Sequence, residues 1–262
     1  MTLINTNIIA IANQKGGVGK TTTVINLATA MAACEKKVLI IDSDPQGNAS
    51  TGLGLDKRVL KSNFYDVIRG DISINETILK TQIPNLFIIP TSMDLAVVEQ
   101  EFVNLEKREE RLKKELEKIN ITFDYILIDC PPSLGLLTLN ALVACRNLLV
   151  PLQVEFYALE GLTQLMETVN QIKSNYNKLL ELQGIVLTMY DKRNKISELV
   201  AYDVKNFFKE KVYKTIIPRN VKISEAPSHG MPILMYDISC PGSQAYASLA
   251  AEIINQENKI NG

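Results

Sequence analysis

Phosphate binding is the chemistry that residues 13–22 could support, since they read Asn-Gln-Lys-Gly-Gly-Val-Gly-Lys-Thr-Thr between a short apolar run and a segment with helical spacing. Glycines let backbone N–H groups approach phosphate oxygens, and the start of the following helix offers unpaired donors and a partial positive charge. In loops of this pattern Lys20 reaches the β- and γ-phosphates and the Thr21 hydroxyl binds Mg²⁺. The sequence therefore predicts a site for ATP and Mg²⁺, with the loop residues Lys15, Gly16, Gly17, Val18, Gly19, Lys20, Thr21 and Thr22.

The loop departs from the common form at one position. Gln14 stands where the first glycine of that form would fall, and Lys15 follows it. A glycine-rich turn that joins a strand to a helix and binds nothing is the competing interpretation. Because Lys20 and Thr21 are both in register, with an apolar run before the loop and a helical pattern after it, we favour ATP binding.

Carboxylates follow two other apolar runs and are candidates for chemistry at the γ-phosphate. Asp129 ends one run, where a Mg²⁺ ligand of a phosphate-loop protein would lie, although it could instead cap the next helix. Asp42 and Asp44 follow another run. Our hypothesis is that Asp44 orients the attacking water while Asp42 supports the Mg²⁺ shell, which would make Thr21, Asp42 and Asp129 the metal residues. The competing interpretation of Asp44 is an Asx turn.

The elements that must hold these residues are short apolar strands alternating with helical segments. Most runs are apolar without alternation, as expected for strands covered on both faces of a parallel sheet. They are Ile8–Ala12, Val38–Asp42, Leu86–Pro90, Tyr125–Asp129, Leu148–Leu152 and Gly184–Thr188. The charged segment Glu106–Lys118 is expected to form a solvated helix face. We predict one doubly wound α/β domain, residues 1–262, with a mostly parallel sheet and helices on both faces.

Composition narrows the class of protein. The formal net charge is −1, so any nucleic-acid site must be a local patch, and 46% hydrophobic residues argue against disorder. The four cysteines have no zinc-site spacing, and we interpret them as reduced thiols. Without a signal-peptide pattern or a membrane-spanning run, we expect a cytoplasmic protein. The one histidine, His229, is interpreted as structural.

A basic patch is predicted in residues 192–222. Nine lysines and arginines against three acidic residues give this segment a charge of +6 and leave −7 for the remainder. One interpretation is a footprint for the DNA phosphate backbone, with the candidate contacts Arg193, Lys195, Arg219 and Lys222. The other is a solvated basic helix whose aromatic residues lie in the core, and charge alone does not decide between them. Those aromatic residues are Tyr202, Phe207, Phe208 and Tyr213.

Several motifs together resemble the ParA/Soj partition ATPases, a branch of the deviant Walker A group that also includes MinD. Besides the loop, they are Asp42-x-Asp44-Pro-Gln-Gly-Asn48, Asp129-Cys-Pro-Pro-Ser, Tyr157-Ala-Leu-Glu-Gly161 and Ser224-Glu-Ala-Pro-Ser-His-Gly230. The resemblance runs from Ile8 to Tyr246, and the last two motifs are the most specific to the ParA/Soj branch. One segment differs, since relatives often carry an arginine where this chain reads Tyr236-Asp-Ile-Ser-Cys-Pro241.

The resemblance implies a slow, Mg²⁺-dependent ATPase that acts as a switch. In such proteins ATP drives formation of a sandwich homodimer, and the lysine matching Lys15 reaches across it to the partner's phosphates. Lys15, Lys20 and Asp44 would then form the catalytic set. The dimer coats double-stranded DNA without sequence preference, and a ParB-like centromere-binding protein stimulates hydrolysis and releases the dimer from the bacterial nucleoid. Further contacts implied by the resemblance are Pro218 and Asn220 to adenine, and Arg193 and Lys222 to DNA.

Two related functions remain as alternatives. A MinD-like membrane-cycling ATPase would need a basic amphipathic C-terminal helix, but residues 238–258 contain no lysine or arginine. We therefore expect the C-terminal helix to pack on the sheet and predict no membrane contact. A metal-carrier relative of the nitrogenase iron protein would need cluster cysteines, and Cys130 and Cys145 lack a recognisable cluster spacing. The motifs and the basic segment favour ATP-dependent DNA partitioning over both.

Overall fold

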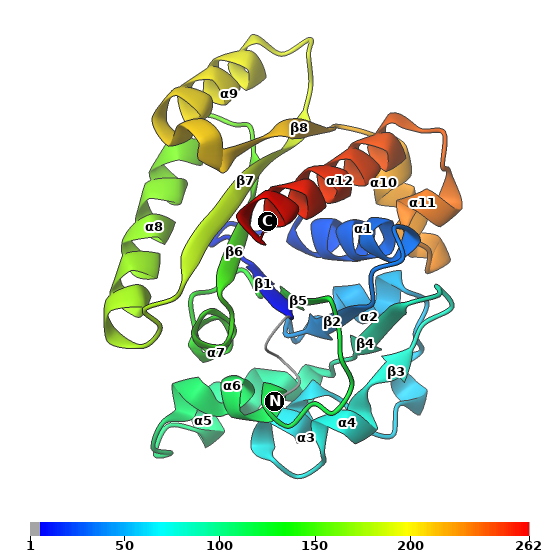
Figure 1. The fold of residues 1–262 in the computed structure, drawn as a ribbon, viewed down its shortest axis with the longest axis vertical. Helices are drawn as coiled ribbons and strands as arrows, with labels where there is room; N and C mark the ends of the chain where they lie inside the picture. The colour runs from blue at the N-terminus through cyan, green and yellow to red at the C-terminus, as the bar shows by residue number, and fades with distance from the viewer. Residues whose placement is uncertain (1–5, 262) are drawn as a thin grey trace.

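The computed structural model describes residues 6–261, which contain an eight-stranded sheet in the order β3-β4-β2-β5-β1-β6-β7-β8 (Figure 1). Neighbouring strands are parallel except β3 and β4, which are antiparallel. The strands are β1 (Asn7–Ile11), β2 (Val38–Asp42), β3 (Leu79–Lys80), β4 (Leu86–Ile89), β5 (Tyr125–Asp129), β6 (Asn147–Gln153), β7 (Glu181–Tyr190) and β8 (Val212–Pro218). The predicted doubly wound, mostly parallel α/β fold is confirmed.

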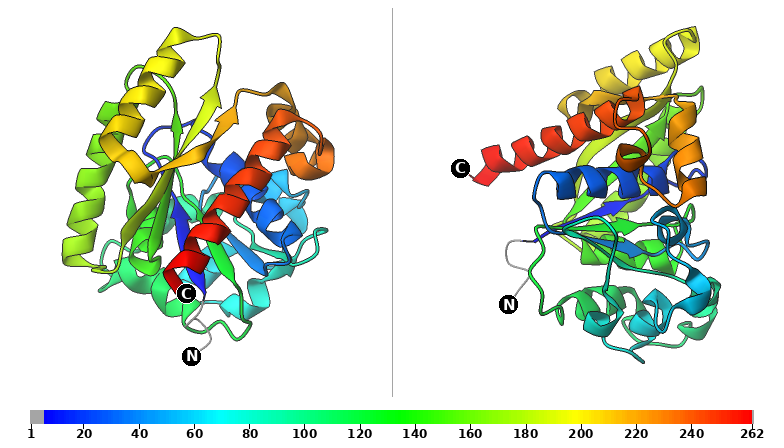
Figure 2. Two further views of the ribbon diagram at one scale, coloured as in Figure 1. Left: turned by 45° about the horizontal axis from the view of Figure 1, so that its top comes forward. Right: turned by 90° about the vertical axis from the view of Figure 1, so that its right-hand side faces the viewer.

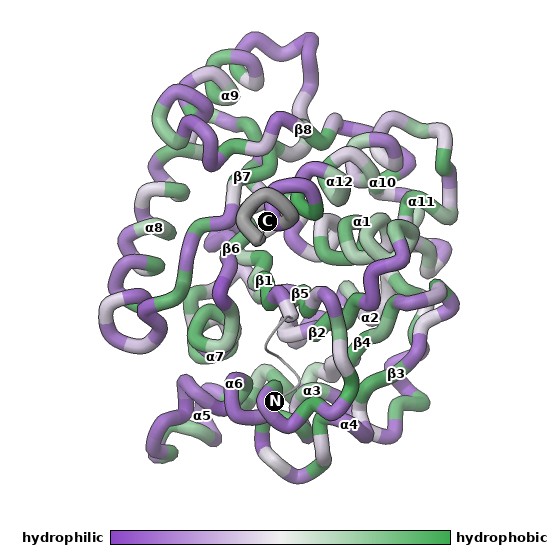
Figure 3. The backbone as a smooth tube through the Cα atoms, viewed as in Figure 1, coloured by the Kyte–Doolittle hydropathy of each residue, from purple (hydrophilic) through white to green (hydrophobic). Residues whose placement is uncertain are grey.

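Helices cover both faces of this sheet (Figures 1 and 2). They are α1 (Lys20–Ala33), α2 (Asn48–Gly52), α3 (Phe64–Arg69), α4 (Ile74–Thr77), α5 (Val98–Glu101), α6 (Arg111–Leu116), α7 (Leu136–Ala144), α8 (Ala158–Asn175), α9 (Lys195–Phe208), α10 (Val221–Glu225), α11 (Ile233–Tyr236) and α12 (Pro241–Asn261). Along β1, Ile9 and Ile11 join the core under α1 and α12, whereas Ala10 joins the core under α7 and α8. Strands with two buried faces need apolar residues at every position, which explains the unbroken runs. Hydrophobic segments accordingly gather in α1, α7 and the central strands (Figure 3).

Two strands and one helix differ from the sequence prediction. The strand β3 has only two residues, and β8 lies at the edge of the sheet, where exposed positions interrupt its apolar pattern. Tyr213, which the helix interpretation of residues 192–222 placed in the core, is buried but belongs to β8. The charged segment 106–118 contains a short 3₁₀ turn followed by α6, in which Leu112 and Leu116 reach the core.

The C-terminal helix α12 packs against α1 and β8, as predicted. Its Tyr246, Leu249 and Ile253 are almost fully buried, and the Tyr246 hydroxyl lies 3.3 Å from the hydroxyl of Thr23. Glu252 accepts hydrogen bonds from two backbone N–H groups of β8 at 2.8 and 3.0 Å, which satisfies donors on this edge strand. Among the described residues, no helix combines the length and the apolar character needed to cross a bilayer.

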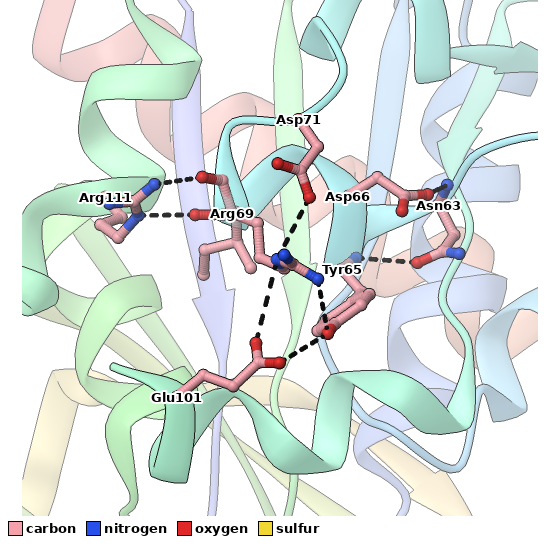
Figure 4. A network of polar contacts seen from close by, with 8 residues as sticks. Asn63, Tyr65, Asp66, Arg69, Asp71, Glu101 and Arg111 are labelled. Atoms are coloured by element: carbon pink, nitrogen blue, oxygen red, sulfur yellow. Dashed lines mark hydrogen bonds and ion pairs between the residues drawn. The ribbon is translucent and has the colours of Figure 1, made fainter. Parts of the chain in front are cut away.

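A polar network fixes both ends of α3 (Figure 4). At its start, Asn63 forms a capping box with the helix. Tyr65 donates a hydrogen bond of 2.9 Å to Glu101 of α5 and accepts one of the same length from Arg69. Arg111 of α6 donates to two carbonyl groups at the end of α3. The short helices that follow β2 and β4 are thereby joined into one layer beside α7.

Candidate nucleotide-binding site

The loop between β1 and α1 has the backbone geometry that its glycines predict. Gly17 and Gly19 have φ angles of 75° and 90°, in the left-handed region that disfavours a side chain. Gly19 is also the N-cap of α1, and no side chain caps this helix. The first N–H groups of α1 therefore point out of the helix without a side-chain acceptor, as an anion site requires.

Buried hydrogen bonds hold this loop against β6 and β7. The Thr188 hydroxyl donates to the carbonyl of Val18, and the Asn13 amide donates to the carbonyl of Pro151, both at 2.8 Å. The side-chain oxygen of Asn13 also accepts from the N–H of Lys15 at 3.0 Å. Asn13 and Thr188 were not predicted to hold the loop, because polar residues at strand ends resemble ordinary turn formers. Their role is visible only once β1, β6 and β7 are neighbours.

The two lysines of the loop have different surroundings. Lys20 is only 7% exposed, and its ammonium donates to the carbonyl of Lys15 at 2.9 Å. Burial lowers the pKa of Lys20, and the carboxylates of Asp129 and Asp44 oppose that shift. Lys15 is about half exposed, and its ammonium forms an ion pair with Glu155, which follows β6. Lys20 thus points into the loop, whereas Lys15 lies at the surface.

Asp42 and Asp129 lie side by side at the carboxyl ends of β2 and β5, where they are register partners. Both are fully buried, and neither oxygen of Asp129 nor Oδ1 of Asp42 has a hydrogen-bond partner. Burial raises the pKa of Asp129 well above its usual value, Asp42 adds to that shift, and the nearby Thr21 hydroxyl opposes it. Burial also raises the pKa of Asp42 to about 6. Two ionised carboxylates buried side by side repel each other, so this pair is unfavourable unless a cation lies between or beside them.

These oxygen donors fit Mg²⁺. This cation prefers carboxylate and hydroxyl oxygens and usually shares its shell with phosphate and water. Thr21 lies in the first turn of α1, and the buried hydroxyl of Ser43 has no hydrogen-bond partner. Within the described part of the chain, no three His, Cys, Asp or Glu side chains are grouped closely enough to hold a metal alone. A cation here would therefore depend on phosphate oxygens to complete its shell.

Asp44 lies in the loop that joins β2 to α2. Its Oδ1 accepts a hydrogen bond from the N–H of Gln46 at 3.0 Å, and the N–H of Gly47 donates to its carbonyl at 2.8 Å, so the Asx turn is present. Asp44 is 8% exposed and close enough to Lys20 to influence its pKa. The turn and the proximity to the loop lysine coexist, and the role of Asp44 in orienting water stays a prediction.

A cavity of about 280 Å³ opens beside the start of α1. Residues of α1, α2 and the segment after α10 line it, and they include Thr21, Thr22, Asn26, Asn48, Thr51 and Pro227. The motif Ser224–Gly230 therefore forms one wall of a cavity that reaches the phosphate loop. Pro218 and Asn220 are not among the lining residues; they lie at the end of β8 and the N-cap of α10, where Asn220 accepts from the N–H of Lys222 at 2.8 Å. Their contact with adenine stays a prediction.

The candidate DNA contacts come together at the carboxyl ends of β7 and β8. Arg193 and Lys195 follow β7, and Arg219 and Lys222 follow β8. The two strands are paired at this end, and the N–H of Arg219 donates to the last carbonyl of β7 at 3.0 Å. The structure therefore gathers residues from two separate parts of the segment on one edge of the sheet.

Acidic neighbours reduce the charge of this edge. Arg193 is 89% exposed and forms an ion pair of 2.8 Å with Asp191, and Lys222 pairs with Glu225 at 3.4 Å. Both acids lie just outside residues 192–222, so including them lowers the excess charge from +6 to +4. The patch is basic but weaker than the sequence count indicates.

The competing interpretation placed the aromatic residues in the core, and the structure does not bear this out for Tyr202 and Phe207. They are 64% and 70% exposed on α9. This helix buries Val200, Ala201 and Val204 against the sheet, and both aromatic residues fall on the other face. The interpretation of the segment as a solvated helix with core aromatic residues therefore holds for buried Tyr213 but not for Tyr202 and Phe207.

A glycine loop at the start of α1, a buried lysine within it and carboxylates at the ends of the adjacent strands define a P-loop nucleoside triphosphatase. A protein-family profile described as an AAA domain matches residues 6–182. The chromosome partitioning protein ParA of Caulobacter vibrioides is 54% identical over 252 residues, which cover 95% of this chain and 94% of that protein. The chain belongs to the ParA/Soj family of chromosome-partitioning ATPases.

Two further similarities extend this result. The sporulation initiation inhibitor protein Soj of Bacillus subtilis is 50% identical over 246 residues, which cover 94% of this chain and 97% of that protein. The solved structure of cobyrinic acid a,c-diamide synthase from Mycobacterium smegmatis with a bound ATP analogue and magnesium has a TM-score of 0.84 and 34% identity, and the match covers 97% of this chain and 96% of that one. The family resemblance inferred from the motifs is confirmed, and it favours DNA partitioning over the MinD-like and metal-carrier alternatives.

Proposed function

We propose that this ATPase is a slow, Mg²⁺-dependent switch for DNA partitioning. ATP binding assembles a sandwich homodimer that holds double-stranded DNA without sequence preference, and a ParB-like protein stimulates hydrolysis and releases the dimer. The whole chain, residues 1–262, acts as one ATPase domain in the cytoplasm, on the nucleoid. The observation that carries the proposal is the buried Asp42–Asp129 pair beside Lys20 at the start of α1. The nucleotide and magnesium in the similar solved structure support the choice of ligands.

The phosphate site assigns a role to each group that surrounds it. Lys20 and the N–H groups of the loop bind the β- and γ-phosphates, while Thr21, Asp42 and Asp129 hold Mg²⁺. Bound Mg²⁺ offsets charge on the phosphates. Asp44 orients the attacking water, but one of its oxygens is already engaged by the N–H of Gln46.

Lys15 is the residue that we assign to the partner subunit's phosphates. In the single chain its ammonium is paired with Glu155 and about half exposed, so it can exchange one anionic partner for another without crossing a buried region. This exposure supports a contact that forms only when two subunits meet.

The DNA-binding surface is the edge formed by Arg193, Lys195, Arg219 and Lys222. A non-specific phosphate footprint needs exposed cations and no base-reading element, and all four residues follow strands at one edge. Because dimerisation doubles the patch, DNA affinity depends on ATP. Salt should weaken the complex strongly.

Replacing Arg193 by alanine should lower the affinity of the ATP-bound protein for duplex DNA by about tenfold and reduce the log–log salt slope by about 1 per subunit. Arg58→Ala is a matched control, because Arg58 is 88% exposed and pairs with Asp56 at 2.9 Å, as Arg193 pairs with Asp191. Fluorescence anisotropy of labelled duplex over a range of salt concentrations measures both quantities. If Arg193→Ala bound DNA as tightly as wild type, or if Arg58→Ala lost as much DNA affinity as Arg193→Ala, the DNA-binding surface would have to lie elsewhere.

The ATP-bound protein should not sediment with anionic liposomes. Among the described side chains of α12, the apolar face formed by Tyr246, Leu249 and Ile253 is already buried against α1 and β8 and is not available to insert into a bilayer. Vesicles of neutral lipid serve as the control for trapping. Robust ATP-dependent sedimentation with anionic vesicles alone would instead support a MinD-like membrane cycle.

A further inference from the structure

Ser50 makes two hydrogen bonds to one oxygen of Asp42. Its N–H and its hydroxyl donate to Oδ2 at 2.8 and 2.6 Å, and the hydroxyl also accepts from the N–H of Thr91 at 3.3 Å. Ser50 lies in α2, Asp42 ends β2, and Thr91 follows β4. All three residues are fully buried. One hydroxyl therefore joins a helix to the ends of two adjacent strands.

This contact determines which oxygen of Asp42 is left free. With Oδ2 held by Ser50, the carboxyl group cannot rotate without losing both hydrogen bonds, and Oδ1 is the oxygen that has no protein partner. The neighbouring carboxyl group is that of Asp129, the register partner of Asp42. The same contact joins the two ends of the loop 43–47, which carries Asp44 between β2 and α2.

We propose that Ser50 is a positioning residue for Mg²⁺-dependent ATP binding. Its hydroxyl orients Asp42 so that Oδ1, which has no hydrogen-bond partner, would be available to the cation. It also fixes the loop that presents Asp44. The inference rests on the proposed function, in which Asp42 belongs to the Mg²⁺ shell. Groups that hold a metal-binding side chain in place commonly change metal affinity by about 10- to 100-fold when they are removed.

If Ser50 had only a structural role, its hydrogen bonds would stabilise α2 without affecting Mg²⁺ binding. A variant that weakens α2 at another position distinguishes this role from the positioning of Asp42. Ala49, also in α2, is fully buried and is not among the residues that line the cavity beside the start of α1. Its methyl side chain has no polar atom to hold the carboxyl group of Asp42. Ala49→Gly therefore weakens the helix without removing a polar partner of Asp42, and it is the matched control.

The test measures the affinity for a fluorescent ATP analogue against Mg²⁺ concentration. Ser50→Ala, and Ser50→Cys, which keeps the volume but has only a weak donor, should need about tenfold more Mg²⁺ for half of the maximal affinity. Ser50→Thr, which keeps the hydroxyl, should stay within about twofold of wild type, as should Ala49→Gly. In EDTA all variants should bind the analogue as weakly as wild type.

Two results would overturn the inference: an unchanged Mg²⁺ requirement in Ser50→Ala and Ser50→Cys, or an equal increase in Ala49→Gly. Circular dichroism verifies folding, and where Ser50→Ala does not fold, the comparison of Ser50→Cys with Ser50→Thr decides. If the wild type bound the analogue equally well with and without Mg²⁺, the proposed metal site itself would be wrong. That outcome differs from one in which the wild type requires Mg²⁺ and the variants require the same Mg²⁺ concentration as the wild type. The second outcome would contradict only the role of Ser50.

Discussion

Replacing Lys20 by alanine should weaken ATP binding by about 100-fold or more, because each charge-assisted hydrogen bond to phosphate contributes about 1.5–3 kcal/mol. Lys20 is buried at the start of α1, and its ammonium is already directed at the loop that would surround the phosphates. Removing this cation would also leave the carboxylates of Asp129 and Asp44 facing the phosphates without a counter-charge. ATP-dependent dimerisation and DNA binding should be lost with nucleotide binding.

Isothermal titration calorimetry with ATP and Mg²⁺ measures this effect. Lys61→Ala, at an exposed position, controls for loss of one positive charge. Without nucleotide, Lys20→Ala should be at least as stable to heat as wild type, because burial disfavours the charged form of Lys20. A Lys20→Ala variant that is folded and binds ATP with wild-type affinity would contradict the assignment of the phosphate loop.

Replacing Asp44 by alanine should reduce the hydrolysis rate by about 100-fold while ATP affinity stays within about threefold of wild type. Positioning of water matters for the chemical step, whereas ground-state binding depends on the loop and the Mg²⁺ residues. Because the ATP state then persists, the variant should remain dimeric and bound to DNA. Single-turnover hydrolysis and size-exclusion chromatography with ATP measure the two halves of this prediction.

Asp56→Ala is the matched control for Asp44→Ala. Asp56 forms the same kind of turn, since its Oδ1 accepts from the N–H two residues later at 3.0 Å, as Oδ1 of Asp44 does. Asp44→Asn adds a second comparison, because it keeps the turn but removes the charge. Hydrolysis at the normal rate in Asp44→Ala would reject the water-orienting role. Loss of ATP binding in Asp44→Ala but not in Asp44→Asn would instead assign Asp44 to the shape of the loop.

Local signals in the sequence were enough to predict the class of site and most of the sheet. Glycine spacing, Lys20 and Thr21 are local signals, because one short loop and the helix that follows it contain the whole motif. Unbroken apolar runs identified the buried strands, and Asp42 and Asp129 were found because both directly follow such runs. Parallel strands end at a common edge, so their proximity could be expected before any coordinates.

Contacts between segments far apart in the chain could not be predicted from the sequence and became visible only in the folded structure. Nothing in local spacing connects Ser50 with Thr91, Thr188 with Val18, or Lys15 with Glu155. Each depends on which strands become neighbours and on the register they adopt, and these follow from packing the whole core. Edge strand β8 was not predicted, because exposed Lys214 interrupts its apolar run. The position of the aromatic residues of α9 was left open, because helical periodicity identifies two faces but only the packed sheet selects the one that is buried.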